Sequence, residues 1–192
     1  MNISETRSRI VATADELYNA KGIQAVGMDE LRAAAGVSLK KLYQEFPSKS
    51  SIVMAVLERR HQSWTEGLDA KVRQAASPRA RLLAIFDYLA QWFAQASFRG
   101  CGFINSFAEL GAVSSEVADY ARKHKESFQD YVGDLSEEAG APPYLAPQLA
   151  ILAEGAQTTA AIAGTSDAAG QARHAAGVLI DAALGREAPG AA

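Results

Sequence analysis

The sequence has little of what would cross-link a small protein, bind a metal or span a membrane. Its 192 residues contain one cysteine, Cys101, which excludes a disulfide framework within the chain and a cysteine-based zinc site. The three histidines are scattered without metal-ligand spacing, and neither a glycine-rich phosphate loop nor a nucleophile elbow occurs. There is no signal peptide and no uninterrupted apolar stretch of membrane-spanning length. We therefore expect a cytoplasmic protein that is not an enzyme and that carries no metal or cofactor.

The sequence also lacks a large excess of either positive or negative charge. A net charge of −3 argues against a protein that coats nucleic acid without regard to sequence. Some of the positive charge is clustered, however, because Lys40, Lys41 and Lys49 lie close together in the sequence. Apolar residues make up 48% of the sequence, which is ample for a packed core.

The spacing of apolar residues predicts an all-α fold. No segment alternates with a period of two over a useful length, whereas apolar residues recur at spacings of three and four throughout. We expect about nine helices, which begin near residues 5, 28, 39, 48, 78, 102, 115, 143 and 168. The expected organisation is a three-helix head over residues 1–47, a helical body over 48–185 and a flexible tail over 186–192.

Residues 28–49 hold the most informative pattern, MDELRAAAGVSLKKLYQEFPSK. It predicts two short helices joined by a tight turn, in which Gly36 ends the first helix and Ser38 caps the second. Leu42 and Phe46 fall on the buried side of the second helix. Its outer side then carries lysines, an amide and a tyrosine, which suit the major groove of DNA.

The residues AGVSLKKLYQEFPSK resemble the helix-turn-helix of the TetR family of transcriptional regulators. In that family an AGVS turn leads into a helix ending LY..F, followed by a PSK-type cap. The likeness extends over residues 6–23, similar to the family's first helix, and over 51–60, similar to its fourth. It implies a homodimer that binds a double-stranded operator with an inverted repeat. It also implies a C-terminal domain that binds a small effector and dimerises through the last two helices.

Seven residues are predicted to bind DNA. The base-proximal candidates are Leu39, Lys40, Lys41 and Gln44, and the phosphate candidates are Ser38, Tyr43 and Lys49. Two lysines on an amphipathic helix are, taken alone, more often a solvated surface than a binding site. A helix of two turns, however, must be held by packing rather than by its own stability, which favours a function for its outer face.

The sequence departs from the family pattern at three places. Leu39, Lys40 and Lys41 stand where the family often has a lysine-glycine-threonine-like start, and Gly27 replaces the usual threonine or serine cap. Glu45 stands where relatives often have an aromatic residue or histidine, and its carboxylate would be repelled by phosphates. We expect it to pair with Lys41 at the i, i+4 spacing or to tilt outward. Arg7, at the start of the first helix, is a weaker phosphate candidate.

The effector site is predicted from aromatic residues of the middle helices, which exceed what a thin bundle requires. The candidate ligand-binding residues are Trp64, Phe86, Phe103, Asn105, Phe107, His124 and Phe128, within a wider set that adds Trp92, Phe93, Tyr131 and Gln157. Each aromatic residue alone is more often core than ligand contact. Together they suggest an apolar or aromatic effector.

Two questions stay open at the level of sequence. The alanine-rich last two helices fit either a four-helix dimer interface or ordinary packing within a monomer, and the helix-turn-helix favours the dimer. Cys101, within RGCGFINSF, fits an inert buried thiol better than a reactive one. The functional prediction is a sequence-specific transcriptional regulator, most simply a repressor released by its effector. The alternative is an effector-independent DNA-binding protein that acts through a protein partner.

Overall fold

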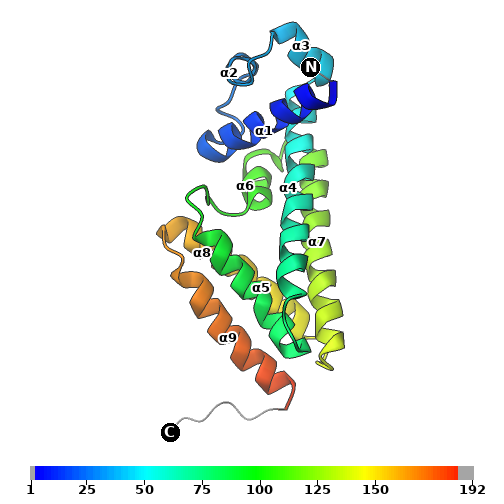
Figure 1. Cartoon of the computed structure of the whole chain (residues 1–192), viewed down its shortest axis with the longest axis vertical. Helices are drawn as coiled ribbons and strands as arrows, with labels where there is room; N and C mark the ends of the chain where they lie inside the picture. The colour runs from blue at the N-terminus through cyan, green and yellow to red at the C-terminus, as the bar shows by residue number, and fades with distance from the viewer. Residues whose placement is uncertain (1–2, 186–192) are drawn as a thin grey trace. The chain divides into compact units, whose positions relative to one another are not determined.

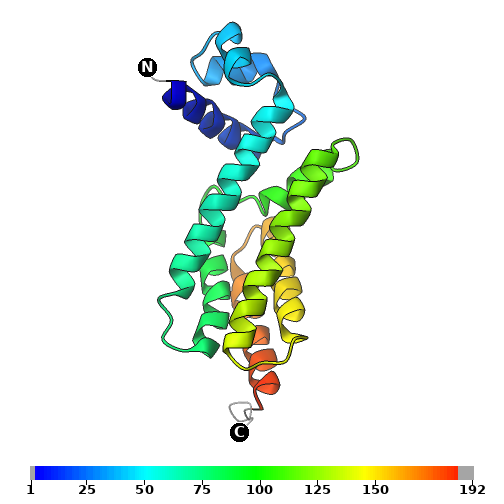
Figure 2. The ribbon, with the colours of Figure 1, turned by 90° about the vertical axis from the view of Figure 1, so that its right-hand side faces the viewer.

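The computed structural model describes residues 3–185, and within them it confirms an all-α fold of nine helices with no strand (Figures 1 and 2). The helices are α1 Ile3–Lys21, α2 Met28–Ala34, α3 Leu39–Glu45, α4 Lys49–Val72, α5 Pro78–Phe93, α6 Gly102–Leu110, α7 Ser115–Glu138, α8 Leu145–Ala163 and α9 Asp167–Ala183. Among the helices described, none combines the length and the apolar character needed to cross a bilayer. The predicted tail, residues 186–192, lies outside the described residues.

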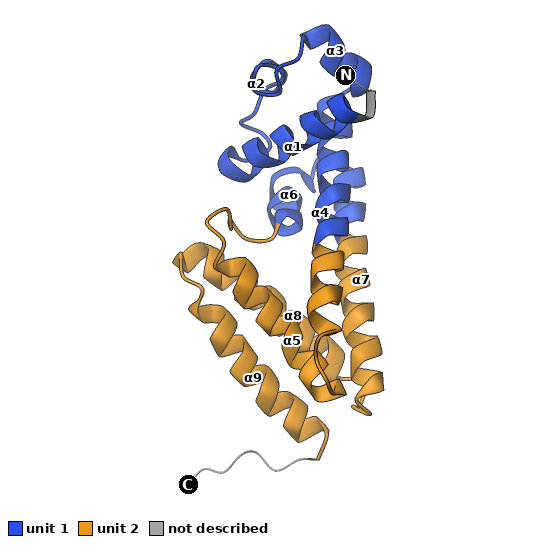
Figure 3. Ribbon diagram, in the orientation of Figure 1, with its two compact units in different colours: residues 1–63, 102–121 blue, residues 64–101, 122–192 orange. Residues whose placement is uncertain are grey.

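The chain divides into two compact units, coloured separately in Figure 3. Unit 1 comprises residues 1–63 and 102–121, and unit 2 comprises residues 64–101 and 122–192. Both α4 and α7 contribute one part to each unit. The predicted boundary between residues 47 and 48 falls inside unit 1, and the division into a DNA-binding and a ligand-binding domain stays a prediction.

Unit 1 is built on a small helical head in which α1, α2 and α3 contact one another. Ile10 and Ala14 of α1, Leu31 of α2 and Leu42 of α3 are buried. Phe46, which directly follows α3, has no exposed surface at all. The apolar spacing seen in the sequence therefore forms the core of this head, and it leaves the opposite side of α3 facing outward.

Unit 2 has α5 at its centre. Seven side chains of this helix are buried, namely Leu82, Leu83, Ala84, Ile85, Phe86, Leu89 and Phe93. Helices α8 and α9 contact each other and both contact α5, and their buried positions are largely alanines, which allow close approach. Arg79 of α5 binds Asp181 of α9 through two bonds of 2.7 Å each, which fixes the two helices to each other.

Candidate nucleic-acid interface and effector site

The turn between α2 and α3 has the geometry that the sequence predicts. Gly36 adopts a left-handed φ of 63°, and the Val37 N–H donates to the Arg32 carbonyl at 3.0 Å, which closes the end of α2. The Ser38 hydroxyl accepts the Lys41 N–H at 3.1 Å and caps α3, as expected. Gly27 precedes α2 in an extended conformation without a side-chain cap. The turn thus fixes where α3 begins and which of its sides faces outward.

The outward side of α3 carries six of the seven predicted DNA-binding residues. Ser38, Leu39, Lys40, Tyr43 and Gln44 are exposed, and Lys41 is half-buried. Tyr43 in particular leaves 47% of its surface exposed although it is a large aromatic residue. A short helix with this many hydrogen-bonding groups on its free side offers donors and acceptors to the edges of base pairs.

Lys41 and Glu45 form the predicted i, i+4 ion pair, with the ammonium nitrogen 2.6 Å from a carboxylate oxygen. The Glu45 side chain is only 6% exposed, so its charge lies against the protein rather than in solvent. The pair removes the repulsion that a free carboxylate would exert on phosphates. It also commits Lys41 to a partner before any DNA is bound.

Arg7 holds the end of α3 in a way that the sequence did not reveal. Its guanidinium donates to the Glu45 carbonyl at 2.6 Å and lies 4.0 Å from the centre of the Phe46 ring. Arginine thus satisfies a free carbonyl at the helix C-terminus. Arg7 and Glu45 are 38 positions apart in the sequence, so no local pattern predicts this contact.

Lys49, the seventh predicted DNA-binding residue, begins α4 instead of lying on α3. Its ammonium donates to the Gln24 carbonyl at 3.4 Å. Burial lowers the pKa of Lys49 because it removes water from the charged form, whereas the negative charge of Glu109 opposes this effect. Ser48 and Ser51 cap the same helix start reciprocally, each hydroxyl accepting the other residue's N–H.

The predicted ligand-binding residues fall into both units. In unit 2 the Trp64 ring meets His124 at a centroid distance of 5.3 Å and Phe128 at 5.2 Å, both edge-to-face. Tyr88 joins this cluster at 6.1 Å from Trp64 and was not predicted. Phe86, also in unit 2, is fully buried in the packing of α5. Three of the predicted residues, Trp64, His124 and Phe128, thus lie together, with Tyr88 as a fourth ring.

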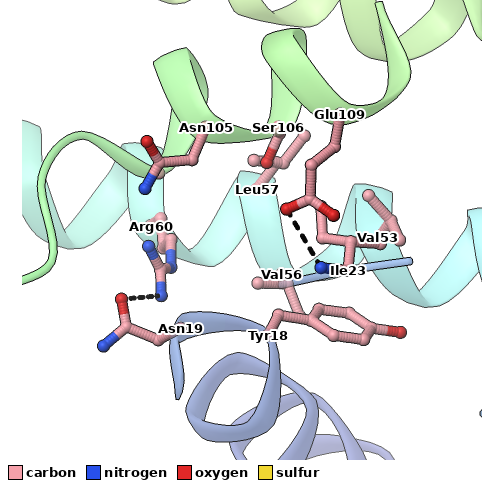
Figure 4. Close-up of a pocket in the computed structure, with 11 residues that line it drawn as sticks. Tyr18, Asn19, Ile23, Val53, Val56, Leu57, Arg60, Asn105, Ser106 and Glu109 are labelled. Carbon is pink, nitrogen blue, oxygen red and sulfur yellow. Dashed lines mark hydrogen bonds between the residues drawn. The ribbon is translucent and has the colours of Figure 1, made fainter. Parts of the chain in front are cut away.

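The other three predicted residues belong to unit 1. Phe103 is buried and lies near His61 and Tyr120, with ring centroids 6.5 and 6.0 Å away. Asn105 and Phe107 are exposed on α6, and Asn105 also lines a small pocket of about 30 Å³ between α1, α4 and α6 (Figure 4). That volume holds about one water molecule, so this pocket is too small for an organic effector.

A larger groove runs between α7 and α8 within unit 2 and has a volume of about 620 Å³. Phe128 lines it together with Ile151, and Gln129 and Thr158 supply polar groups. This volume lies in the range of small-molecule sites. The sequence did not predict the groove, because its two walls come from helices whose pairing no local pattern encodes.

Cys101 is 5% exposed. Its sulfur lies 3.4 Å from the Lys125 ammonium, which also forms an ion pair of 2.5 Å with Glu154. The burial agrees with the interpretation as an inert thiol, and its chemical reactivity stays a prediction.

Comparison with known proteins agrees with this geometry. The family model described as bacterial regulatory proteins of the tetR family matches residues 10–56, which span the head and the start of α4. The transcriptional activator FasR of Mycolicibacterium smegmatis is 30% identical over 148 residues, which cover 77% of this chain and 66% of FasR. The chain belongs to the TetR family. It is thus a member of a family of DNA-binding transcriptional regulators, which are not enzymes.

Of two further comparisons, one supports the class of protein and the other supports the fold. The transcriptional repressor NemR of Escherichia coli is 27% identical over 115 residues, which cover 59% of this chain and 58% of NemR. The chain therefore spans less than two thirds of the length of either curated relative. A TetR-family regulator from Streptomyces coelicolor has the same fold, with a TM-score of 0.89, 23% identity and coverage of 94% of this chain and 97% of that one.

Proposed function

We propose that the chain is a sequence-specific repressor that binds an inverted-repeat operator as a homodimer and is released by a small apolar or aromatic effector. The observation that carries the DNA-binding part is the outward side of α3, where polar groups stand free on a helix held by its buried side. Since a regulator of this kind acts where the genome is, we place it in the cytoplasm.

The roles of the individual side chains follow from their positions. Lys40 and Gln44 lie on the free side of α3 and offer donors to guanine and adenine edges, and Leu39 offers contact to a thymine methyl. Lys41 takes part at the expense of its bond to Glu45. Tyr43, Ser38 and Lys49 bind backbone phosphates, which position the head without reading sequence.

The test compares a duplex of about 30 base pairs, selected by the wild-type protein from a random pool, with a scrambled duplex of equal length. Fluorescence anisotropy is expected to show that Lys40→Ala and Gln44→Ala weaken binding to the selected duplex by about tenfold and to the scrambled one much less. Lys49→Ala is expected to weaken both alike and to lower the salt slope by about 0.9. Equal losses on both duplexes for Lys40→Ala would contradict the base-reading assignment. Lys123→Ala, which removes an exposed lysine of α7, is the charge-matched control.

The effector part of the proposal rests on the aromatic cluster of Trp64, His124 and Phe128 and on the α7–α8 groove, which Phe128 also lines. A thermal-shift screen with apolar and aromatic compounds tests it, since a ligand that binds only the folded state raises the melting temperature. A compound that raises the melting temperature of the wild type is expected to release the selected duplex from it. The same compound is expected not to raise the melting temperature of Phe128→Leu. A screen in which no compound changes both melting and DNA binding would favour the effector-independent alternative, which the relatives do not support.

The direction of regulation has a second candidate, because FasR is named an activator and NemR a repressor. A reporter gene placed behind the selected duplex separates the two. Repression predicts that reporter output falls when the protein is expressed and recovers with the effector. Output that rises on expression would assign activation instead.

The dimer is supported by apolar side chains that stand exposed on the last two helices. Ile162 of α8 and Val178 of α9 face solvent in the single chain. Exposed small residues such as Gly170 of α9 permit close helix approach. We therefore propose that a second copy covers these residues through its own α8 and α9.

A further inference from the structure

Within unit 1, Glu109 of α6 binds the loop between α1 and α2. Glu109 lies in the last turn of α6, and both oxygens of its carboxylate face the loop. The Ile23 N–H donates to Oε1 at 3.1 Å, as Figure 4 shows, and the Gln24 N–H donates to Oε2 at 2.9 Å. The Gln24 side chain also donates from Nε2 to the Glu109 carbonyl at 2.6 Å. Glu109 thus accepts three hydrogen bonds from two adjacent loop residues.

Gly22 makes this close approach possible. It has a left-handed φ of 85°, and a Cβ at this position would lie 3.2 Å from Glu109 Oε1. The carboxylate therefore rests against bare backbone, where any larger residue would be both strained and crowded. The Glu109 carboxylate therefore packs directly against the backbone of the loop.

The same loop reaches Lys49. The Gln24 carbonyl accepts the Lys49 ammonium at 3.4 Å, so Gln24 binds Glu109 through its donors and Lys49 through its acceptor. The Glu109 charge is also close enough to act on Lys49, since it raises the pKa of that lysine against the larger effect of burial. One short path of bonds thus leads from α6 to the first residue of α4.

Arg60 of α4 lies beside the other end of α6. Arg60 of α4 donates to the Asp15 carboxylate and, at 3.2 Å, to Asn19 Oδ1, both on α1 (Figure 4 shows the Asn19 bond). The Arg60 side chain also packs against Gly102, the first residue of α6, where an added Cβ would lie in close contact with its Nη1. The start of α6 thus contacts the arginine that joins α4 to α1.

We propose that Glu109 is a positioning residue for DNA binding, which fixes residues 23 and 24 and, through the Gln24 carbonyl, holds Lys49 where it meets a backbone phosphate. The inference rests on the proposed function, because it takes Lys49 to be a phosphate contact. Glu109 itself touches no DNA in this arrangement. Its effect on binding therefore depends on Lys49.

A double-mutant cycle in the full chain tests this dependence. Glu109→Gln keeps the shape but offers one acceptor, and its amide hydrogens face the second loop N–H. Binding of a fluorescein-labelled scrambled duplex is measured at about 50 mM salt, where phosphate contacts dominate. Glu109→Gln is expected to weaken binding about threefold to tenfold in the wild type and less than about twofold when Lys49 is already alanine. Equal losses in both backgrounds would overturn the proposal. Glu16→Gln, the same charge change at an exposed site of α1, is the control and is expected to change nothing.

Hydrogen exchange provides a readout that needs no DNA. The Ile23 and Gln24 amides are expected to exchange about tenfold faster or more in Glu109→Gln, while the amide of Ala14 in the core of α1 keeps its wild-type rate. Wild-type exchange at both loop amides would show that Glu109 does not hold the loop, and the proposal would fail. Wild-type protein that binds neither duplex would instead overturn the proposed function, and the role of Glu109 in DNA binding with it. If the wild type binds DNA but the loop amides of Glu109→Gln exchange at the wild-type rate, only the positioning role of Glu109 is wrong and the proposed function stands.

Discussion

Side chains in the head serve two different roles: some stabilise the fold, and others form the proposed DNA-binding surface. Lys41 pairs with a nearly buried carboxylate, and Arg7 caps a helix end, whereas Lys40 and Gln44 are exposed on α3. Residues of one chemical type in one short segment thus differ in what they stabilise. Mutations separate these roles because stability and DNA binding are measured independently.

Lys41→Ala is expected to destabilise the protein, and Lys40→Ala is not. Removing Lys41 leaves the Glu45 carboxylate against the protein without its cation, which lowers the free energy of unfolding by roughly 1 kcal/mol. Lys40 is exposed, so its removal is expected to change that free energy by less than about 0.5 kcal/mol. Urea unfolding followed by circular dichroism compares the two variants. Equal midpoints would mean that the ion pair does not stabilise the head.

Tyr18 ties stability to alkaline pH. Burial raises the pKa of Tyr18 to about 12, and its hydroxyl has no hydrogen-bond partner among the described residues. A pKa raised on folding gives stability that is complete below the unfolded pKa near 10 and is lost as pH rises toward 12. Tyr18→Phe is therefore expected to keep or slightly raise stability at pH 7. It is also expected to reduce the loss between pH 10 and 12 by roughly 2 kcal/mol.

Unfolding curves at pH 7, 10 and 12 check this prediction. Tyr43→Phe removes an exposed hydroxyl from the same head and is expected to leave the pH dependence unchanged. A Tyr18→Phe protein that loses stability with pH as steeply as the wild type would contradict the assignment.

At the scale of helices, the sequence was most informative where a residue ends or begins an element. Gly36 and Ser38 are predicted to mark helix ends, and the structure has helix ends there. The expected start of α8 at Pro143 was early by two residues, because a turn closed by the Leu145 N–H and the Pro142 carbonyl precedes the helix. Local chemistry thus predicts the elements well and their exact ends less well.

Contacts between distant residues were not predictable in the same way. Glu109 and Arg7 act on backbone groups many positions away, and an exposed Glu or Arg with no partner would have the same local sequence. The predicted ligand-binding set shows the same limit, since aromatic content identifies Trp64 and Phe128 but does not say which of the other rings meet them. Periodicity reports which side of a helix is buried, and it does not report what covers that side.

Gly36→Ala tests the turn of the helix-turn-helix. A left-handed φ of 63° strains any residue with a Cβ, so the free energy of unfolding is expected to fall by about 1 kcal/mol. Gly27→Ala is the matched control, because Gly27 has φ −85° and open space around it, and a change of less than about 0.5 kcal/mol is expected. Thermal unfolding of both variants decides the matter. A Gly36→Ala protein as stable as the control would show that the turn relaxes without cost.

At the scale of the whole molecule, the two units expose different kinds of residues. Unit 1 exposes polar groups on a short helix, whereas unit 2 exposes apolar groups on its last two helices. An operator with an inverted repeat needs two heads, and we propose that the exposed apolar residues of α8 and α9 join them.

Ile162→Asp is expected to convert the proposed dimer to a monomer, because it places a charge in the apolar contact. Ile162 is 84% exposed in the single chain, and Val113, in the loop before α7, is 81% exposed. Val113→Asp is therefore a matched control that lies outside the proposed interface. Light scattering during gel filtration measures the mass of each protein. A wild type that elutes as a monomer, or an Ile162→Asp dimer, would contradict the interface.

The pairing of Lys41 with Glu45 bears on how such a protein finds its site on a chromosome. We expect a lysine paired within its own helix to release few counterions when it meets arbitrary DNA, which weakens nonspecific complexes. In the proposed function the bond to Glu45 is exchanged for one to the DNA only at a matching base pair. We therefore expect Glu45 to shorten the time that each copy spends on the wrong sequence, at some cost in affinity.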